Sequence, residues 1–154
     1  MPSRKLAATL VAGLAFAAIA AVAVAQDVTV DPAIAALSPA DMVLKREELM
    51  KSNGGTLRSA GNLSGAEAVA AADTLIYNFT NLPVLFGEST KGIASGALPA
   101  VWDNAEGFNA IMVKALDAAN AMKTAAEAGD AAAYGDANKM LGAACGECHQ
   151  SFRS

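Results

Sequence analysis

Four stretches of the sequence repeat apolar residues at the three- and four-residue spacing of an α-helix, and this spacing most restricts how the chain can fold. Of the 154 residues, 54% are hydrophobic. Much of this share is alanine, the best helix former, whereas Val, Ile and Tyr are sparse. Amphipathic helices bury their apolar faces against one another. The sequence therefore predicts an all-α fold, an antiparallel four-helix bundle.

Capping signals mark the starts of the first two helices. Ser38, followed by a proline, is an N-cap candidate for the first helix. Ser64 and Glu67 have the spacing of a capping box before the second helix. The first helix also contains Gly54-Gly55, which weakens or ends it unless a tertiary contact carries it on to about residue 60.

A long connection is expected between the second and third helices. Pro83 is expected to follow the end of the second helix, and residues 83–100 combine glycines and prolines with little periodicity. The third helix is expected to start at or just after residues 99–102, and Gly129-Asp130 is expected to separate it from the fourth. Residues 26–37 show no strong pattern, which predicts a loose N-terminal extension.

The N-terminal residues have the composition of a targeting signal. Arg4-Lys5 precedes an uncharged apolar run at residues 6–24, and Ala23-Val24-Ala25 fits a small-x-small cleavage site. This order predicts a signal peptide over residues 1–25. An apolar run of this length is also compatible with a membrane anchor.

The mature chain is expected to be acidic and exported. Removing residues 1–25 leaves nine basic and fifteen acidic residues, in one domain over residues 38–154 preceded by the extension over residues 26–37. An acidic chain without clustered Lys and Arg is a poor nucleic-acid binder, and no further stretch is apolar enough to span a membrane. No acid–base pair or nucleophile array is visible, so we do not expect an enzyme. The export signal predicts a periplasmic location in a bacterium.

The segment that carries chemistry is Cys145-Gly146-Glu147-Cys148-His149, close to the C-terminus. C-x-x-C-H is the attachment signature of c-type haem. Thiols three residues apart lie on one side of a helical turn and can bond the two vinyl groups of one porphyrin. The next residue, His149, can then ligate the iron as the proximal axial ligand. His149 is the only histidine, and Cys145 and Cys148 are the only cysteines, so we predict one covalently attached haem c with its iron.

Other uses of a C-x-x-C pair fit this sequence less well. A thioredoxin-like redox site needs a βαβ context, which a helical chain does not provide. A zinc site needs four nitrogen or sulfur ligands, and the chain has only two cysteines and one histidine. A disulfide between Cys145 and Cys148 would close a very tight loop. A buried porphyrin would also supply the apolar bulk that an alanine-rich core lacks.

A C-x-x-C-H motif on the last helix of a four-helix bundle resembles the class II cytochromes c, which are cytochrome c′ and its low-spin relatives. The resemblance covers roughly residues 40–153. Leu82-Pro83-Val84-Leu85-Phe86 is similar to the family's L-P-x-x-F segment, and Pro99-Ala100-Val101-Trp102 is similar to its P-x-I-W start of the third helix. Phe152-Arg153 matches an aromatic–arginine pair, which implies that Arg153 lies beside the proximal histidine.

The first predicted helix is similar to the opening helix of that family. The resemblance implies that Arg46 lies near a haem propionate and that Met50, four residues later, points at the distal face of the iron. Met50 as the sixth ligand would give a low-spin, six-coordinate haem, because a thioether is a soft donor that suits haem iron and raises its potential. The alternative is that Met50 only packs against the porphyrin.

The resulting hypothesis is an exported mono-haem cytochrome that transfers single electrons between redox partners, which the sequence does not identify. The alternative is a five-coordinate, high-spin cytochrome c′ that binds nitric oxide or carbon monoxide. A thiol–disulfide oxidoreductase is a third hypothesis. The resemblance is compatible with a homodimer formed through the first two helices, as in many cytochromes c′, and also with a monomer.

Overall fold

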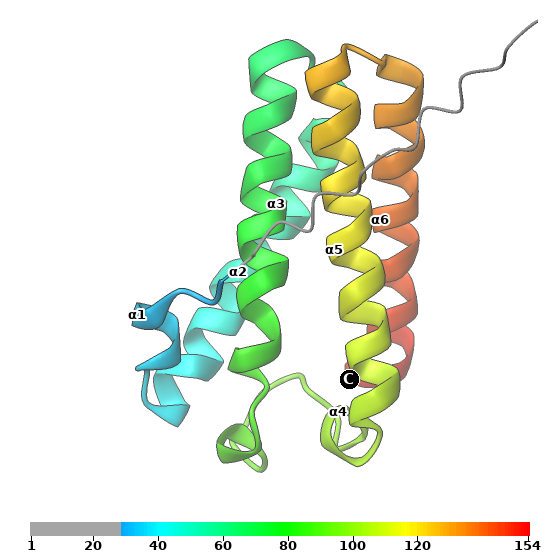
Figure 1. The fold of residues 1–154 in the computed structure, drawn as a ribbon. Coiled ribbons are helices and arrows are strands. Elements are labelled where there is room, and N and C mark those ends of the chain that lie inside the picture. Colours follow the sequence, from blue (N-terminus) through cyan, green and yellow to red (C-terminus); the bar gives the residue numbers. More distant parts are fainter. Residues whose placement is uncertain (1–28) are drawn as a thin grey trace, which may run out of the picture.

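The computed structural model describes residues 29–154, so the expected signal peptide over residues 1–25 lies outside the described residues. Four long helices lie side by side (Figure 1). The elements in chain order are α1 (Pro32–Ala35), α2 (Pro39–Ala60), α3 (Gly65–Leu85), the short 3-10 helix η1 (Glu88–Thr90), α4 (Ala100–Asp103), α5 (Ala105–Ala128) and α6 (Ala131–Phe152). The prediction of an all-α four-helix bundle is confirmed. No helix of the described part is both long and apolar enough to cross a membrane.

Helix α2 begins at its predicted cap and continues past its two glycines. The Ser38 hydroxyl accepts a hydrogen bond from the Asp41 backbone N–H at 3.2 Å, which satisfies one of the donors that a first helical turn leaves free. The helix runs through Gly54 and Gly55 to Ala60, which is fully buried. Because α2 packs mainly on α3 and touches α6 at few positions, it is attached to the bundle chiefly through one neighbour.

Helix α3 differs from its prediction at both ends. Ser64 has the extended backbone of an N-cap, but its side chain makes no capping hydrogen bond, so the predicted capping box is not formed. The helix continues through Pro83 to Leu85, and the expectation that it ends before Pro83 is wrong. Leu82 and Leu85 are both fully buried, and their packing offsets the hydrogen bond that a proline cannot donate.

The connection between α3 and α5 is tied down by side chains. The Trp102 indole N–H donates to the Phe86 carbonyl at 2.8 Å, which joins α4 to the start of the connection. Asn104 interrupts the predicted third helix, and its side chain accepts a hydrogen bond from the Gly107 N–H at 3.2 Å. The predicted helix is therefore divided into the single turn α4 and the long helix α5.

Helices α5 and α6 are joined by the tight turn that Gly129-Asp130 predicts. Gly129 has a φ of +68°, a left-handed conformation that favours glycine. Asp130 caps α6 by accepting a hydrogen bond from the Ala133 N–H at 2.9 Å. The residues of α6 that recur at helical spacing on one face are all buried: Tyr134, Ala137, Leu141, Ala144, Cys148 and Phe152. This burial presents the C-x-x-C-H turn on a helix that packs extensively on α5.

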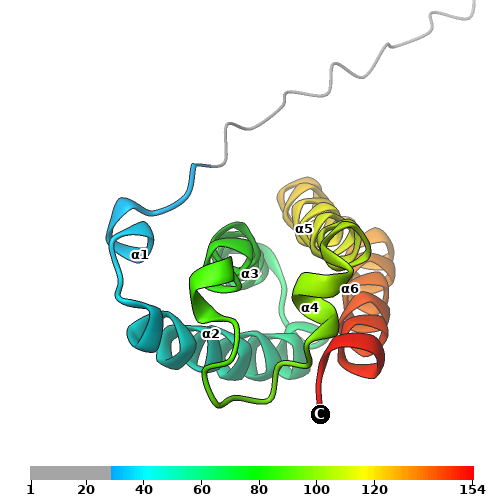
Figure 2. The ribbon, with the colours of Figure 1, turned by 90° about the horizontal axis from the view of Figure 1, so that it is seen from below.

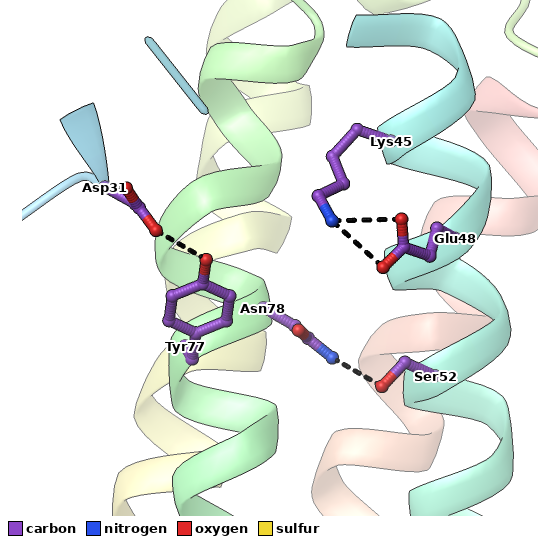
Figure 3. Close-up of polar contacts among 6 residues, drawn as sticks. All are labelled: Asp31, Lys45, Glu48, Ser52, Tyr77 and Asn78. Carbon is purple, nitrogen blue, oxygen red and sulfur yellow. Dashed lines mark hydrogen bonds and ion pairs between the residues drawn. The ribbon is translucent and has the colours of Figure 1, made fainter. Parts of the chain in front are cut away.

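The N-terminal segment is packed from residue 31 onward, which the sequence did not predict. The Asp31 N–H donates to Asn81 Oδ1 at 2.8 Å. Its carboxylate accepts bonds from the Ala33 N–H and, as Figure 3 shows, from the Tyr77 hydroxyl, both at 2.8 Å. Ile34 is 2% exposed and belongs to the core. Helix α1 is therefore a folded part of the bundle, docked on α3.

Candidate functional site

A cavity of about 370 Å³ lies at the end of the bundle where α6 ends; Figure 2 views the molecule from this end. The lining residues come from α2, the crossover connection, α4, α5 and α6: Arg46, Glu47, Met50, Lys51, Phe86, Ser95, Gly96, Ala97, Val101, Phe108, Cys148, His149, Phe152 and Arg153. Its volume is within the range of small-molecule and cofactor sites. Five of the six predicted site residues line it, and Cys145 lies one turn before Cys148 on α6.

Arg46 is a buried cation in the cavity wall, with 4% of its surface exposed. Its guanidinium donates to Ser95 Oγ at 2.8 Å and to the Leu85 carbonyl at 3.4 Å, and it lies 4.3 Å from the centroid of the Phe86 ring. Burial lowers the pKa of Arg46. No ion pair to Arg46 is formed by any carboxylate in residues 29–154. Because a buried charge needs a partner, this wall suits an anionic group of a ligand.

The α2 wall and the α6 wall supply the two candidate iron ligands. Met50 is half-buried and lies one turn after Arg46, on the same face of α2. His149 is exposed and lines the cavity from α6. Desolvation by burial, followed by the nearby charge of Arg153, lowers the pKa of His149. A lowered pKa favours the neutral imidazole, which is the form that binds metals.

Both cysteines are free thiols in this structure. Cys148 is 6% exposed and Cys145 is half-buried. Burial raises the pKa of both, that of Cys148 to about 11. Redox-active C-x-x-C cysteines have lowered pKa values, since the thiolate is the nucleophile, so these thiols lack that activation. Among the described residues, no three His, Cys, Asp or Glu side chains converge on one point, as a closed zinc site requires.

The C-terminal residues close one side of the cavity by pairing with the crossover connection. The Leu98 N–H donates to the Phe152 carbonyl at 3.0 Å, and the Ser154 N–H donates to the Gly96 carbonyl at 2.9 Å. These bonds place Arg153 opposite Ala97 in an isolated antiparallel bridge. Arg153 therefore lies on the cavity wall, four residues after His149.

Three phenylalanines, two of which belong to segments that carry the family resemblance (Phe86 and Phe152), form an apolar wall of the cavity. The rings of Phe86 and Phe108 lie 4.8 Å apart, and those of Phe108 and Phe152 lie 5.5 Å apart. Phe108 belongs to the apolar face of α5, and helical periodicity is the only signal that the sequence gives for it. Ser95, which orients Arg46, was not predicted at all because the connection has no periodicity that would mark it. These residues fit the face of a large flat apolar group.

The residues around the cavity fit a covalently attached haem. Cys145 and Cys148 provide two free thiols on one helical turn, and His149 follows them at the cavity. Arg46 offers an unpaired buried charge to a carboxylate substituent. This donor set, with aromatic walls and a thioether on the facing helix, has the features of a class II c-type cytochrome site.

Comparisons with known proteins agree with this class. Residues 41–153 match the family model described as cytochrome C′. Cytochrome c′ of Pararhodospirillum photometricum is 38% identical over 123 residues, which cover 75% of this chain and 98% of the relative. Cytochrome c-556 of Agrobacterium tumefaciens (strain B2A) is 37% identical over 118 residues, which cover 72% of this chain and 95% of the relative. The crystal structure of cytochrome c′ from Thermochromatium tepidum superposes with a TM-score of 0.70 at 25% sequence identity. The match covers 77% of this chain and 98% of the crystallised chain.

The chain belongs to the cytochrome c′ family, which confirms the resemblance seen in the sequence. Members of this family carry one covalently attached haem c, so haem c with its iron is the cofactor of this protein. The relatives include proteins named cytochrome c′ and proteins named cytochrome c-556. The family therefore establishes the cofactor.

Proposed function

We propose that the protein carries single electrons between redox partners, with the haem iron held between His149 and Met50. When bound, the iron supplies a one-electron change between its ferric and ferrous states. The observation that supports this proposal most directly is that Met50 and His149 line the same cavity from two different helices, α2 and α6. A thioether opposite an imidazole suits electron transfer, because it stabilises the reduced iron and occupies the position that an external ligand would take.

The other predicted residues have distinct roles in this proposal. Cys145 and Cys148 form the thioether links that keep the cofactor on α6. Arg46 pairs with a haem propionate, which gives its buried guanidinium the counter-charge that no ion pair within residues 29–154 provides. Arg153 lies beside His149 and favours the neutral imidazole through its positive charge.

The substitution Met50→Ala tests ligation by Met50. We expect the ferric holoprotein to change from a low-spin to a high-spin visible spectrum, to lose its methionine-to-iron charge-transfer band and to show a lower reduction potential. Met140→Ala is the matched control, because Met140 lies on the surface of α6 with 64% of its area exposed. A Met50→Ala spectrum identical to that of the wild type would refute the ligand role.

A five-coordinate protein that binds nitric oxide or carbon monoxide is the second candidate. Met50 is only half-buried, and the aromatic rings of Phe86 and Phe108 crowd the cavity, as a pocket for a small apolar gas requires. One cytochrome c′ that is 26% identical to this chain, with a TM-score of 0.68, is described as having a ligand-controlled dimer dissociation. A high-spin ferrous spectrum in the wild type, with tight binding of carbon monoxide, would favour this function.

We further propose that the protein is periplasmic, that cleavage after Ala25 removes the signal peptide, and that the mature protein is not an enzyme. We also propose that the protein forms a homodimer and that its redox partners are other proteins. Intact mass spectrometry of the purified protein tests the processing and the cofactor together. The expected mass is that of residues 26–154 plus one haem. A bare polypeptide with a reducible bond between Cys145 and Cys148 would favour the thiol–disulfide hypothesis instead.

A further inference from the structure

Two buried asparagines face each other between α2 and α3, next to the turn that carries Met50. Asn53 is 5% exposed and Asn78 is 2% exposed. The side-chain N–H₂ of Asn78 donates to Asn53 Oδ1 at 2.7 Å and to Ser52 Oγ at 3.1 Å; Figure 3 shows the bond to Ser52. Asn53 Nδ2 has no hydrogen-bond partner among the described residues. The side chain of Asn53 is therefore oriented by Asn78.

Apart from the buried Leu49 and the bonds of Arg46 one turn earlier, few contacts outside α3 constrain this part of α2. Gly54 and Gly55 follow directly, and glycine is a weak helix former. Neither glycine is required by close packing: a Cβ at Gly55 would meet nothing within 4 Å, and one at Gly54 would approach only the tip of the flexible Arg58 side chain, at 3.3 Å. Helix α2 also touches α6 at few positions. The turn that carries Met50 is thus fixed mainly from the side of α3.

We propose that Asn78 is a positioning residue, which holds the Met50 turn of α2 at the cavity through its bonds to Ser52 and Asn53. This inference rests on the proposed role of Met50 at the iron. A buried polar pair fixes the register and rotation of one helix against another, as buried asparagines do in coiled coils. Met50 lies one turn before Asn53, so a rotation of α2 at Asn53 changes the distance between Met50 and His149.

The chain offers a matched control on the same helix. Asn81 is 1% exposed, accepts a bond from the Asp31 N–H and donates to the Tyr77 carbonyl. It therefore holds α1, and it makes no side-chain bond to α2. Asn78→Ala and Asn81→Ala remove the same group from the same helix, at comparable burial, but only Asn78→Ala releases α2.

The experiment uses the holoprotein and two readouts. The first is the hydrogen-exchange rate of the backbone amides of residues 47–54, and the second is the high-spin fraction of the ferric visible spectrum. For Asn78→Ala we expect exchange about tenfold faster in this segment, because a buried Asn53 loses its partner, and a larger high-spin fraction. For Asn81→Ala we expect wild-type values in both. If Asn78→Ala does not fold, Ser52→Ala removes one of the two bonds and should shift both readouts in the same direction, by less.

The two proposals fail in different ways. If Met50→Ala leaves the spectrum unchanged, the ligand role fails, while the exchange of residues 47–54 in Asn78→Ala still tests whether Asn78 holds this turn. If Met50 is a ligand, Asn78→Ala should have no further effect on the spectrum of Met50→Ala, because its effect passes through Met50. Wild-type exchange in Asn78→Ala, or equal effects of Asn81→Ala, would overturn the positioning role in either case. Where Met50→Ala has shown Met50 to be a ligand, a wild-type spectrum of Asn78→Ala despite faster exchange would overturn it as well.

Discussion

The substitution Arg46→Met gives a sharp test of the proposed propionate contact, because the presence and the absence of an anionic partner predict stability changes of opposite sign. Methionine keeps an unbranched apolar stem of similar reach but removes the charge and all its donors. Arg46 is 4% exposed, so its charge is poorly solvated, and burial lowers its pKa. Within residues 29–154 the hydrogen-bond and ring contacts of Arg46, which are Ser95 Oγ, the Leu85 carbonyl and the Phe86 ring, are uncharged. The charge of Glu47 opposes the effect of burial on the pKa of Arg46, but Glu47 forms no ion pair with it.

The expected magnitude follows from these contacts. If a propionate pairs with Arg46, removing one partner of a buried ion pair lowers the free energy of unfolding by about 3–5 kcal/mol. If no anion is present, the loss of the bond to Ser95 costs roughly 1.5–3 kcal/mol, and the loss of the cation–π contact with Phe86 costs about 1 kcal/mol. Relief of the buried, unpaired charge then offsets both by several kcal/mol. The variant would be about as stable as the wild type, or more stable.

The assay is guanidinium chloride unfolding of the holoprotein, followed by helical circular dichroism. The thioether links keep the haem on the unfolded chain, so cofactor loss does not complicate the equilibrium. Arg58→Met is the control, because Arg58 lies on the same helix with an exposed side chain, and we expect it to change the free energy of unfolding by less than about 0.5 kcal/mol. An Arg46→Met protein as stable as the wild type would show that Arg46 has no anionic partner.

Two further predictions concern parts of the bundle remote from the cavity. The hydrogen bond from the Tyr77 hydroxyl, followed by that from the Ala33 N–H, lowers the pKa of Asp31 below its ordinary value of 3.8. The resulting stabilisation is present above that value and is lost as the pH falls through the lowered pKa. The stability difference between wild type and Tyr77→Phe should therefore shrink as the pH falls below 3.8, and a difference independent of pH would contradict the assignment. Gly129→Ala should destabilise the protein by roughly 1–2 kcal/mol because of its φ of +68°. Gly135→Ala, inside α6 where a Cβ would meet nothing within 4 Å, should stabilise it by about 0.5–1 kcal/mol; thermal unfolding measures both, and equal shifts would refute the backbone explanation.

Local signals predicted the parts of the fold that local interactions decide. The apolar stripe of α6 and the Gly129-Asp130 turn depend on helical periodicity and on glycine's access to positive φ, both of which can be seen in the sequence. The continuation of α3 past Pro83 could not be predicted, because it depends on the burial of Leu85 by residues distant in sequence. Helix α1 escaped prediction for the same reason, since its anchor, Asn81, lies 50 residues after Asp31.

The residues of the candidate site also fall into those that the sequence predicts and those that only the structure reveals. C-x-x-C-H is contiguous, so its chemistry can be predicted from spacing alone, and Arg46 and Met50 came from a family resemblance. Ser95 and Asn78 lie in segments whose sequence gives no hint of a partner. Each became recognisable only when a hydrogen bond across the fold, of Arg46 with Ser95 or of Asn53 with Asn78, was observed.

The attachment of α2 to the rest of the bundle links the stability of the protein to the state of its iron. Helix α6 carries the covalent links and packs extensively on α5, so it holds the cofactor without help from α2. Helix α2 packs mainly on α3, contains two glycines that packing does not require, and brings Arg46 and Met50 to the cavity. Of the four long helices, α2 has the fewest contacts with the rest of the bundle. An interaction between α2 and the haem would therefore add directly to the free energy that holds α2 in place. If Met50 ligates the iron, the reciprocity of linked equilibria requires that ligation favour the docked α2 by the same coupling free energy by which docking of α2 favours ligation.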